Sequence, residues 1–204
     1  MAKRNLFVTG IGTGIGKTIV SAILTEKLKA DYWKPVQSGE LDNSDTMKVK
    51  SLISNASSVF HPETYRLTQP FSPHKSADLD EIKIDSQQFT LPQTANNLII
   101  EGAGGLMVPL NNNFLIIDLI KQLNAEVMLV SQNYLGSINH TLLSALALKQ
   151  YQIPVAGIIF NGDRDTYSED CILQYTGFKL LGHIPQYTAL NKVTVITAGD
   201  NITL

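Results

Sequence analysis

Short apolar runs recur along the chain, and most of them are continuous rather than alternating with polar residues. They lie at residues 5–9, 32–36, 98–101, 127–131, 155–160 and 180–184. A continuous run of this length is typical of a strand that is buried on both faces, as in a parallel sheet. We therefore expect these runs to be the strands of one buried sheet.

Helical periodicity fills several of the intervals between these runs. Apolar residues recur at helical spacing over residues 17–29, 46–54, 114–123 and 138–151. Alternating strands and helices predict an α/β fold with a mainly parallel sheet flanked by helices on both faces. Residues 56–93 are rich in Pro, Ser, Thr and Asp, and they predict irregular structure, either a lid or long connections.

Composition narrows the choice of partner. The chain has 204 residues, of which 44% are hydrophobic, and no linker or repeat divides it, so we expect a single domain over residues 1–204. The net charge is −2, and lysines and arginines are scattered singly. This pattern lacks the basic patch that nucleic acid or an anionic membrane requires. The expected partner is a small molecule.

The chain shows no pattern for export or membrane insertion. The first residues lead into only a short apolar run, which is not typical of a signal peptide. Residues 127–148 lack Asp, Glu, Lys and Arg, but polar side chains such as Gln132 and His140 argue against a membrane span. The single Cys171 cannot form an internal disulfide and fits a reducing compartment. We expect a cytoplasmic protein.

The first apolar run leads into a glycine-rich loop that ends in Gly16, Lys17 and Thr18 and opens a predicted helix. Glycines let consecutive backbone N–H groups converge on an anion, and the helix start adds a positive dipole. In such a P-loop, Lys17 would reach the β- and γ-phosphates and the Thr18 hydroxyl would bind Mg²⁺. Five residues separate Gly10 from Gly16, where the strict pattern has four. We interpret the loop as a P-loop in spite of this difference.

The same loop also matches the opening of short-chain dehydrogenases, which need a Tyr-x-x-x-Lys motif further along the chain. Tyr175 and Lys179 have this spacing, but Gly177 interrupts the helix that should carry both. A nicotinamide site also needs an acidic residue after the second strand, and residues 35–38 contain none. The dehydrogenase is therefore the less favoured alternative.

Two carboxylates follow predicted strands, where ligands collect in parallel sheets. Asp45 comes shortly after the second run, and Glu101 ends the third run directly before glycines. Carboxylates in such places suit Mg²⁺. Asp45 fits an N-cap of the next helix equally well. Glu101 follows three apolar residues, so we expect it to be buried and to need a compensating charge.

Other polar residues follow the remaining runs. Lys34 is either a solvated surface lysine or a cation that holds a transferring anion, and the sequence does not separate these two interpretations. Residues 134–140 open a helix that offers a second anion-binding N-terminus with Asn139 in its first turn. His140 is expected to be a structural hydrogen-bonding residue. Asn161 could contact a purine edge or simply shape a turn.

Taken together, these motifs resemble the dethiobiotin synthetase family. The blocks are Gly16-Lys17-Thr18, Lys34-Pro35-Val36 with Ser38-Gly39, Asn43-Ser44-Asp45, Ser72-Pro73-His74, Glu101-Gly102-Ala103-Gly104-Gly105, Gly136-Ser137-Ile138-Asn139-His140, Asn161 and Gly182-His183-Ile184-Pro185. They occur in the family's order. The resemblance implies a homodimeric P-loop enzyme of biotin biosynthesis, which makes dethiobiotin from 7,8-diaminononanoate, CO₂ or bicarbonate, and ATP with Mg²⁺.

The resemblance also implies a role for each matching residue. The catalytic residues would be Thr13, Lys17 and Lys34. The substrate would be bound by Ser38 and, across the subunit interface, by Gly136, Ser137, Asn139 and Tyr167. ATP would be bound by Gly14, Ile15, Gly16, Lys17, Thr18, Asp45, Glu101, Gly102, Ala103, Gly104, Asn161, Pro185, Gln186 and Tyr187, and Mg²⁺ by Thr18, Asp45 and Glu101. The sequence after Tyr187 matches the family poorly, so no ribose contact is assigned there.

A partitioning-type ATPase switch is the alternative from another functional class. Such proteins share the Gly-Lys-Thr loop and the parallel sheet, but they carry a signature lysine early in the loop, where this chain has Gly12. They also use a C-terminal amphipathic helix or a basic face to reach a membrane or DNA. Residues 188–204 show neither pattern. The switch is therefore disfavoured.

Overall fold

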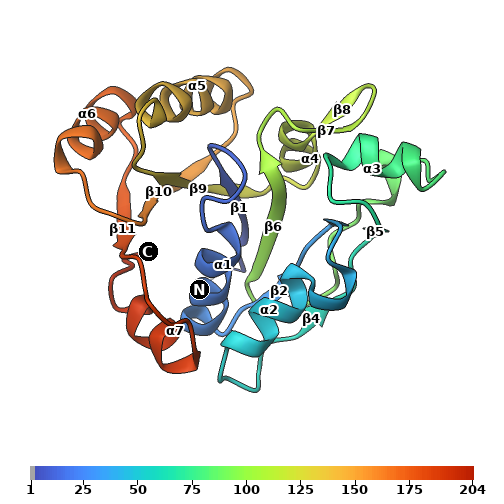
Figure 1. Ribbon diagram of the computed structural model, residues 1–204, viewed down its shortest axis with the longest axis horizontal. Helices are drawn as coiled ribbons and strands as arrows, with labels where there is room; N and C mark the ends of the chain where they lie inside the picture. Colours follow the sequence, from blue (N-terminus) through green and yellow to red (C-terminus); the bar gives the residue numbers. More distant parts are fainter. Residues whose placement is uncertain (1–2) are drawn as a thin grey trace.

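The first apolar run forms β1 (Asn5–Gly10), the middle strand of a seven-stranded sheet in the computed structural model, which describes residues 3–204 (Figure 1). The strand order is β11-β10-β9-β1-β6-β2-β4, and every pairing in this sheet is parallel. The other strands are β2 (Asp31–Trp33), β4 (Phe60–His61), β6 (Leu98–Gly105), β9 (Glu126–Gln132), β10 (Val155–Asn161) and β11 (Leu180–Ile184). The predicted parallel sheet is confirmed.

Helices cover both faces of the sheet, because successive residues of a strand point to opposite sides. Leu6 and Val8 of β1 belong to one core with α1 (Lys17–Leu28), α2 (Asp45–Leu52) and α7 (Lys192–Gly199). Phe7 belongs to the other core, with α4 (Ile116–Gln122), α5 (Ser137–Gln150) and α6 (Thr166–Thr176). The two cores share one sheet, so the predicted single α/β domain with helices on both faces is confirmed. Within residues 3–204, no helix combines the length and the hydrophobicity that crossing a membrane requires.

The apolar run at 32–36 is not one strand, as the sequence predicted, but two. The ladder between β2 and β6 stops at Trp33, and the chain resumes as β3 (Val36–Ser38) in a separate parallel pair with β5 (Tyr65–Leu67). Pro35 has no backbone N–H to continue the ladder, which explains the break. Lys34 therefore leaves the main sheet at the end of β2.

Residues 56–93 contain more regular structure than the sequence predicted. They form β4, β5, α3 (Pro73–Leu79) and a 3₁₀ turn, Ser86–Gln88. Side chains on or beside α3 hold the preceding segment, because Asp80 accepts hydrogen bonds from the backbone and hydroxyl of Thr68, and Ser76 Oγ donates to the Gln69 carbonyl at 2.8 Å. These elements are too short to show a hydrophobic period, so the prediction of irregular structure was wrong there.

One further boundary differs from the expected one, and two helices were not expected. The predicted helix at 114–123 begins as β8 (Phe114–Leu115), which pairs with β7 (Pro109–Asn111), and turns into α4 only at Ile116. Helices α6 and α7 were not predicted. Each begins after a polar N-cap, Asp165 or Asn191, whose side chain accepts a hydrogen bond from a backbone N–H of the first turn.

Candidate active site

The loop between β1 and α1 contains a glycine, Gly16, that no other residue could replace. Gly16 has φ +89°, and a Cβ there would lie 2.2 Å from Nδ2 of Asn161. That amide nitrogen donates a hydrogen bond of 3.0 Å to the Ile15 carbonyl. Only glycine fits this position, because the backbone is left-handed and Asn161 is so close. Asn161, at the end of β10, thus braces the loop from two strands away in the sheet.

Lys17 begins α1 and points back into the loop, where its Nζ donates to the Gly12 carbonyl at 2.8 Å. The pKa of Lys17 is lowered to about 8, mainly by burial and also by the positive charge of Lys34, although the negative charges of Glu101 and Asp45 act in the opposite direction. Lys17 therefore carries a buried ammonium that lies inside the glycine loop. This arrangement suits the binding of an anion.

Glu101 lies on β6, is 1% exposed and accepts hydrogen bonds at both carboxylate oxygens. Oε1 accepts from Thr18 Oγ1 at 2.8 Å and from Lys34 Nζ at 3.3 Å. Oε2 accepts from the Tyr32 hydroxyl at 2.9 Å. The expectation that Glu101 is buried and has a compensating charge is confirmed, and Lys34 supplies that charge.

Lys34 is 4% exposed, so the interpretation as a solvated surface lysine is wrong. Its Nζ lies 2.8 Å from Oδ2 of Asp45 and 3.3 Å from Oε1 of Glu101. Burial by itself would lower the pKa of Lys34, but the two carboxylates outweigh burial and raise it. Lys34 thus stays charged, and its ammonium joins the two carboxylates.

Asp45 is the first residue of α2, and the N-cap is Ser44, whose Oγ accepts from the Met47 backbone N–H at 3.3 Å. The alternative that Asp45 itself caps the helix is therefore wrong. Burial alone would raise the pKa of Asp45, but Lys34 and, less strongly, Lys48 lower it. The Asp45 backbone N–H is fixed by Gln37 Oε1 at 3.1 Å, which ties α2 to β3.

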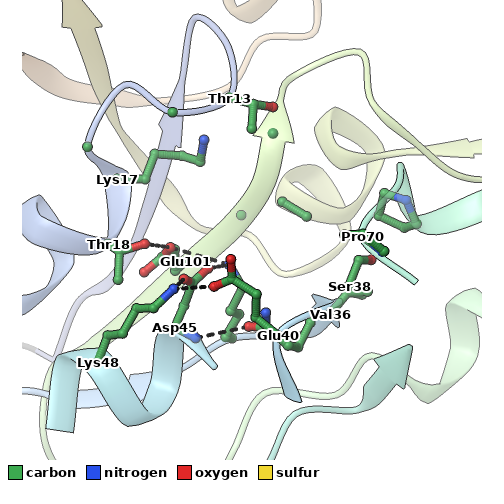
Figure 2. Close-up of a pocket in the computed structure, with 18 of the residues that line it drawn as sticks. Thr13, Lys17, Thr18, Val36, Ser38, Glu40, Asp45, Lys48, Pro70 and Glu101 are labelled. Atoms are coloured by element: carbon green, nitrogen blue, oxygen red, sulfur yellow. Dashed lines mark hydrogen bonds and ion pairs between the residues drawn. The ribbon is translucent and has the colours of Figure 1, made fainter. Parts of the chain in front are cut away.

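These groups line one cleft, with a volume of about 900 Å³. Figure 2 shows Lys17 and Thr18 reaching in from the start of α1, Glu101 from β6, and Asp45 and Lys48 from α2. Of the predicted site residues, the cleft is lined by Thr13, Gly14, Gly16, Lys17, Thr18, Lys34, Ser38, Asp45, Glu101, Gly102, Ala103 and Gly104. The cleft also has an apolar wall, made by Val36, Pro70, Phe71, Pro73 and Val108.

Other predicted site residues lie outside this cleft. Ile15 packs in the core with α1, and Asn161 contacts the P-loop from behind. Pro185, Gln186 and Tyr187 follow the end of β11. Gly136, Ser137 and Asn139 lie at the start of α5, with Gly136 as its N-cap, and Tyr167, which is 87% exposed, is the second residue of α6. The structure therefore brings together the residues predicted for phosphate and cation binding, and leaves the α5 and α6 residues apart from them.

Several residues of the site were not predicted. Tyr32 lies in an apolar run and is indistinguishable there from an ordinary core residue. Lys48 could have been found, because it lies three positions after Asp45 on a predicted helix; its Nζ is 3.7 Å from Asp45 Oδ1 and also pairs with Glu40. Pro70 and Phe71 lie in the segment predicted to be irregular, which carried no signal for them.

The structure also bears on the dehydrogenase alternative. Gly177 caps the C-terminus of α6 in a left-handed conformation, φ +68°, and Lys179 lies beyond it, directly before β11. Tyr175 and Lys179 therefore do not share a helix. The dehydrogenase motif is not formed.

The first strand of the parallel sheet runs into a glycine loop, and a lysine and a threonine open the helix that follows. Carboxylates lie at nearby strand ends. These features define a P-loop nucleotide-binding protein. A family model described as an AAA domain matches residues 4–194. Two relatives named ATP-dependent dethiobiotin synthetase BioD are each 50% identical to this chain. The match to the protein from Christiangramia forsetii covers 94% of this chain and 92% of the relative. The match to the protein from Cytophaga hutchinsonii covers 96% and 94%. The chain belongs to the dethiobiotin synthetase family.

Solved structures show the same fold at much lower identity. MinD from Pyrococcus horikoshii, solved with Mg-ADP, superposes with a TM-score of 0.59 at 15% identity and covers 97% of this chain and 86% of that one. A ParA family ATPase from Chlorobium tepidum gives 0.55 at 14% identity, covering 98% of both chains. These likenesses define the fold alone. The partitioning-type ATPases thus share the architecture, whereas the dethiobiotin synthetases share the sequence.

Proposed function

We propose that this protein closes the ureido ring of dethiobiotin from 7,8-diaminononanoate and CO₂ at the expense of ATP, releasing ADP and phosphate. The observation that carries the proposal is the convergence of two buried lysines, Lys17 of the P-loop and Lys34 after β2, on one cleft with Asp45 and Glu101. A P-loop needs only Lys17 to bind a nucleotide. The second ammonium is available for a second anion beside the γ-phosphate.

The nucleotide phosphates would lie on the loop from Gly14 to Thr18, with Gly102, Ala103 and Gly104 opposite. Gly104 has φ +69°, and its backbone approaches the loop closely enough that a Cβ would lie 3.5 Å from Thr13 Oγ1. Adenine would be received by Asn161 and the segment 185–187. Because these follow β10 and β11, they lie on the side of β1 away from Lys34, as an extended nucleotide requires.

Thr18, Asp45 and Glu101 fit a Mg²⁺ ion by their chemistry and their convergence. All three offer oxygen ligands, which Mg²⁺ prefers. The two carboxylates already share one cation, because the Lys34 ammonium lies within 3.3 Å of both. When bound, the ion would neutralise charge on the transferring phosphoryl group.

The reaction would begin with carbamate formation, in which one substrate amine attacks CO₂ and loses a proton. A carbamate oxygen then attacks the γ-phosphorus of ATP, and ADP leaves. The second amine attacks the carbonyl carbon of the mixed anhydride and expels phosphate, which closes the ring. The substrate supplies both nucleophiles, so the protein contributes mainly orientation and neutralisation of charge. Lys17 and Lys34 would neutralise it.

Thr13 and Ser38 would hold the carbamate by hydrogen bonds. Ser38 Oγ is buried, lines the cleft and has no hydrogen-bond partner among residues 3–204. A buried hydroxyl without a partner carries a free-energy cost that a bound polar group removes. The apolar wall around Pro70 and Phe71 would cover the methylene chain of the substrate, leaving its carboxylate to be bound at the far end.

The substrate carboxylate would be bound by the start of α5 from a second copy of this chain. Gly136, Ser137 and Asn139 lie outside the cleft of their own chain, so within one chain they cannot contact a substrate next to Lys34. Apolar side chains directly before and along this helix are exposed, with Leu135, Leu143 and Leu146 at 104%, 56% and 61%. A helix start surrounded by such residues favours a homodimer that shares its two sites, with Tyr167 as a further contact.

One coupled assay tests the proposed function. We expect phosphate release from ATP to require both 7,8-diaminononanoate and bicarbonate, with dethiobiotin formed in equal amount and detected by mass spectrometry. Turnover that ignores the diamine but responds to DNA or lipid vesicles would instead indicate a partitioning-type switch. Turnover without any of these additions would also overturn the proposal.

A further inference from the structure

We propose that Tyr32 is a positioning residue for the reaction, and that its hydroxyl orients the Glu101 carboxylate toward the bound cation. The inference rests on the proposed function, in which Glu101 is a cation ligand. No motif of the sequence pointed to Tyr32.

The register between β2 and β6 places Tyr32 on the same face of the sheet as Glu101. Tyr32 is fully buried and pairs with Ile99 of β6 on one side and with Phe60 of β4 on the other. Ile99 and Glu101 point to the same face of the sheet, because side chains two positions apart on a strand share a face. The Tyr32 side chain therefore emerges beside Ile99 and extends to Glu101, where its hydroxyl donates to Oε2 at 2.9 Å.

The ring of Tyr32 is held firmly. It packs against Phe60 with ring centroids 5.6 Å apart, inside the core that contains α1 and α2. A tyrosine has few rotatable bonds, and the surrounding core leaves its hydroxyl little freedom. The hydrogen bond to Glu101 therefore has a rigid donor.

The three donors on Glu101 divide between its two oxygens. Thr18 and Lys34, both of which line the cleft, donate to Oε1, whereas Tyr32 donates to Oε2 from the core side. Without Tyr32, the carboxylate would be held at one oxygen only and could rotate about its bond to the side chain. The Tyr32 hydroxyl keeps Oε2 in the core and Oε1 facing the cleft.

Tyr32 does this without neutralising the carboxylate. A lysine or arginine in its place would bring a positive charge and weaken the attraction of Glu101 for a cation. The phenol is uncharged, and both burial and the negative charge of Glu101 raise the pKa of Tyr32 well above its ordinary value. Tyr32 thus adds no positive charge beside Glu101.

Tyr32→Phe tests this role, because it removes the hydroxyl and leaves the ring. Binding of Mn²⁺, used as a probe in the presence of a non-hydrolysable ATP analogue, is measured by electron paramagnetic resonance. We expect the Kd for Mn²⁺ to rise about tenfold, as a lost neutral hydrogen bond to a charged group implies. We also expect kcat to fall while the KM for the diamine stays within about twofold.

Tyr65→Phe is the matched control. The Tyr65 hydroxyl also has a hydrogen-bond partner, since it accepts from the Asp85 backbone N–H at 2.8 Å, but Tyr65 does not line the cleft. The substitution should lower the Tm without changing the Mn²⁺ affinity. In a Glu101→Gln background, Tyr32→Phe should no longer change the Mn²⁺ affinity, because its effect acts through that carboxylate.

A Tyr32→Phe variant that binds Mn²⁺ within twofold of the unchanged protein, despite a lower Tm, would show that Tyr32 only fills the core. Should the variant melt near the assay temperature, the same comparison is made in the cold with sucrose, which favours the folded state. The Mn²⁺ measurement needs no turnover. Failure of this inference is therefore distinguishable from failure to form dethiobiotin.

Discussion

The ammonium nitrogen of Lys34 lies 2.8 Å from Oδ2 of Asp45, a carboxylate that belongs to a different element and opens the helix facing the P-loop. The same nitrogen contacts Glu101, and all three groups line the cleft. Taken alone, these two carboxylates and one lysine carry a net negative charge, and Lys48 contacts the other oxygen of Asp45 at 3.7 Å. Such a site attracts a divalent cation while keeping one ammonium next to the reacting phosphate.

Lys34→Gln should separate chemistry from nucleotide binding. The ammonium would act mainly on charge that develops during phosphoryl transfer, so its loss should cost about 3 kcal/mol, or roughly a hundredfold in kcat for dethiobiotin formation. The Kd for ATP, measured by calorimetry, should stay near normal. Lys48→Gln is the matched control, because Lys48 also pairs with Asp45 but is partly exposed; we expect a much smaller loss of kcat. A kcat within a few-fold for Lys34→Gln would remove Lys34 from the mechanism.

Glu101→Gln should keep the fold and lose most of the activity. The substitution preserves the shape of the side chain but removes the negative charge that would hold Mg²⁺. We expect the remaining dethiobiotin formation to require a much higher Mg²⁺ concentration, with circular dichroism close to that of the unchanged protein. Undiminished turnover at ordinary Mg²⁺ concentrations would exclude Glu101 as a cation ligand.

ATP binding should weaken as the pH rises above about 8, because burial lowers the pKa of Lys17 to about 8 in the free protein. A bound phosphate favours the charged ammonium, so binding must take up a proton once the pH exceeds this value, and affinity should fall by up to about tenfold per pH unit. Calorimetry in two buffers of different ionisation enthalpy measures the uptake. Lys34→Gln should move the onset of this proton uptake to higher pH, because the charge of Lys34 lowers the pKa of Lys17. Affinity that is flat across this range would contradict the prediction.

The proposed dimer predicts a mass of about twice 22.4 kDa by light scattering. Leu143→Glu or Leu146→Glu should shift the protein toward the monomer and lower dethiobiotin formation with it, because each places a charge on the exposed apolar face of α5. Val193→Glu is the matched control, since Val193 is 70% exposed but lies on α7, across the sheet. A fully active monomer would exclude a site shared between subunits.

Much of the fold was predictable because long, buried strands leave continuous apolar runs. The same reasoning placed Asp45 and Glu101, since residues after parallel strands meet at one edge of the sheet. For Lys34 the sequence left two interpretations, because burial depends on Asp45 and Glu101 folding over it. Neither partner is a neighbour in the chain.

The remaining site residues could not be predicted for a different reason. The part that Tyr32 plays depends on the register between β2 and β6, and a tyrosine in an apolar run carries no sign of it. Pro70 and Phe71 reach the cleft only because Gly39 leaves room, since a Cβ on Gly39 would lie 2.7 Å from Pro70 Cβ. Contacts of this kind arise between segments that are each too short to show a pattern.

The break between β2 and β3 divides the cleft into two parts that are carried by different sheets. On one side of Lys34 and Pro35 is the main sheet, which carries the P-loop and Glu101; on the other is the small sheet of β3 and β5, which leads into Pro70 and Phe71. Along the chain, the short connection through Pro35 joins the lysine to that second part, and Gln37 of β3 also holds the Asp45 backbone N–H. An enzyme engineered for a shorter or longer diamine could therefore be rebuilt in residues 66–73 while the phosphate-binding frame and Lys34 stay where they are.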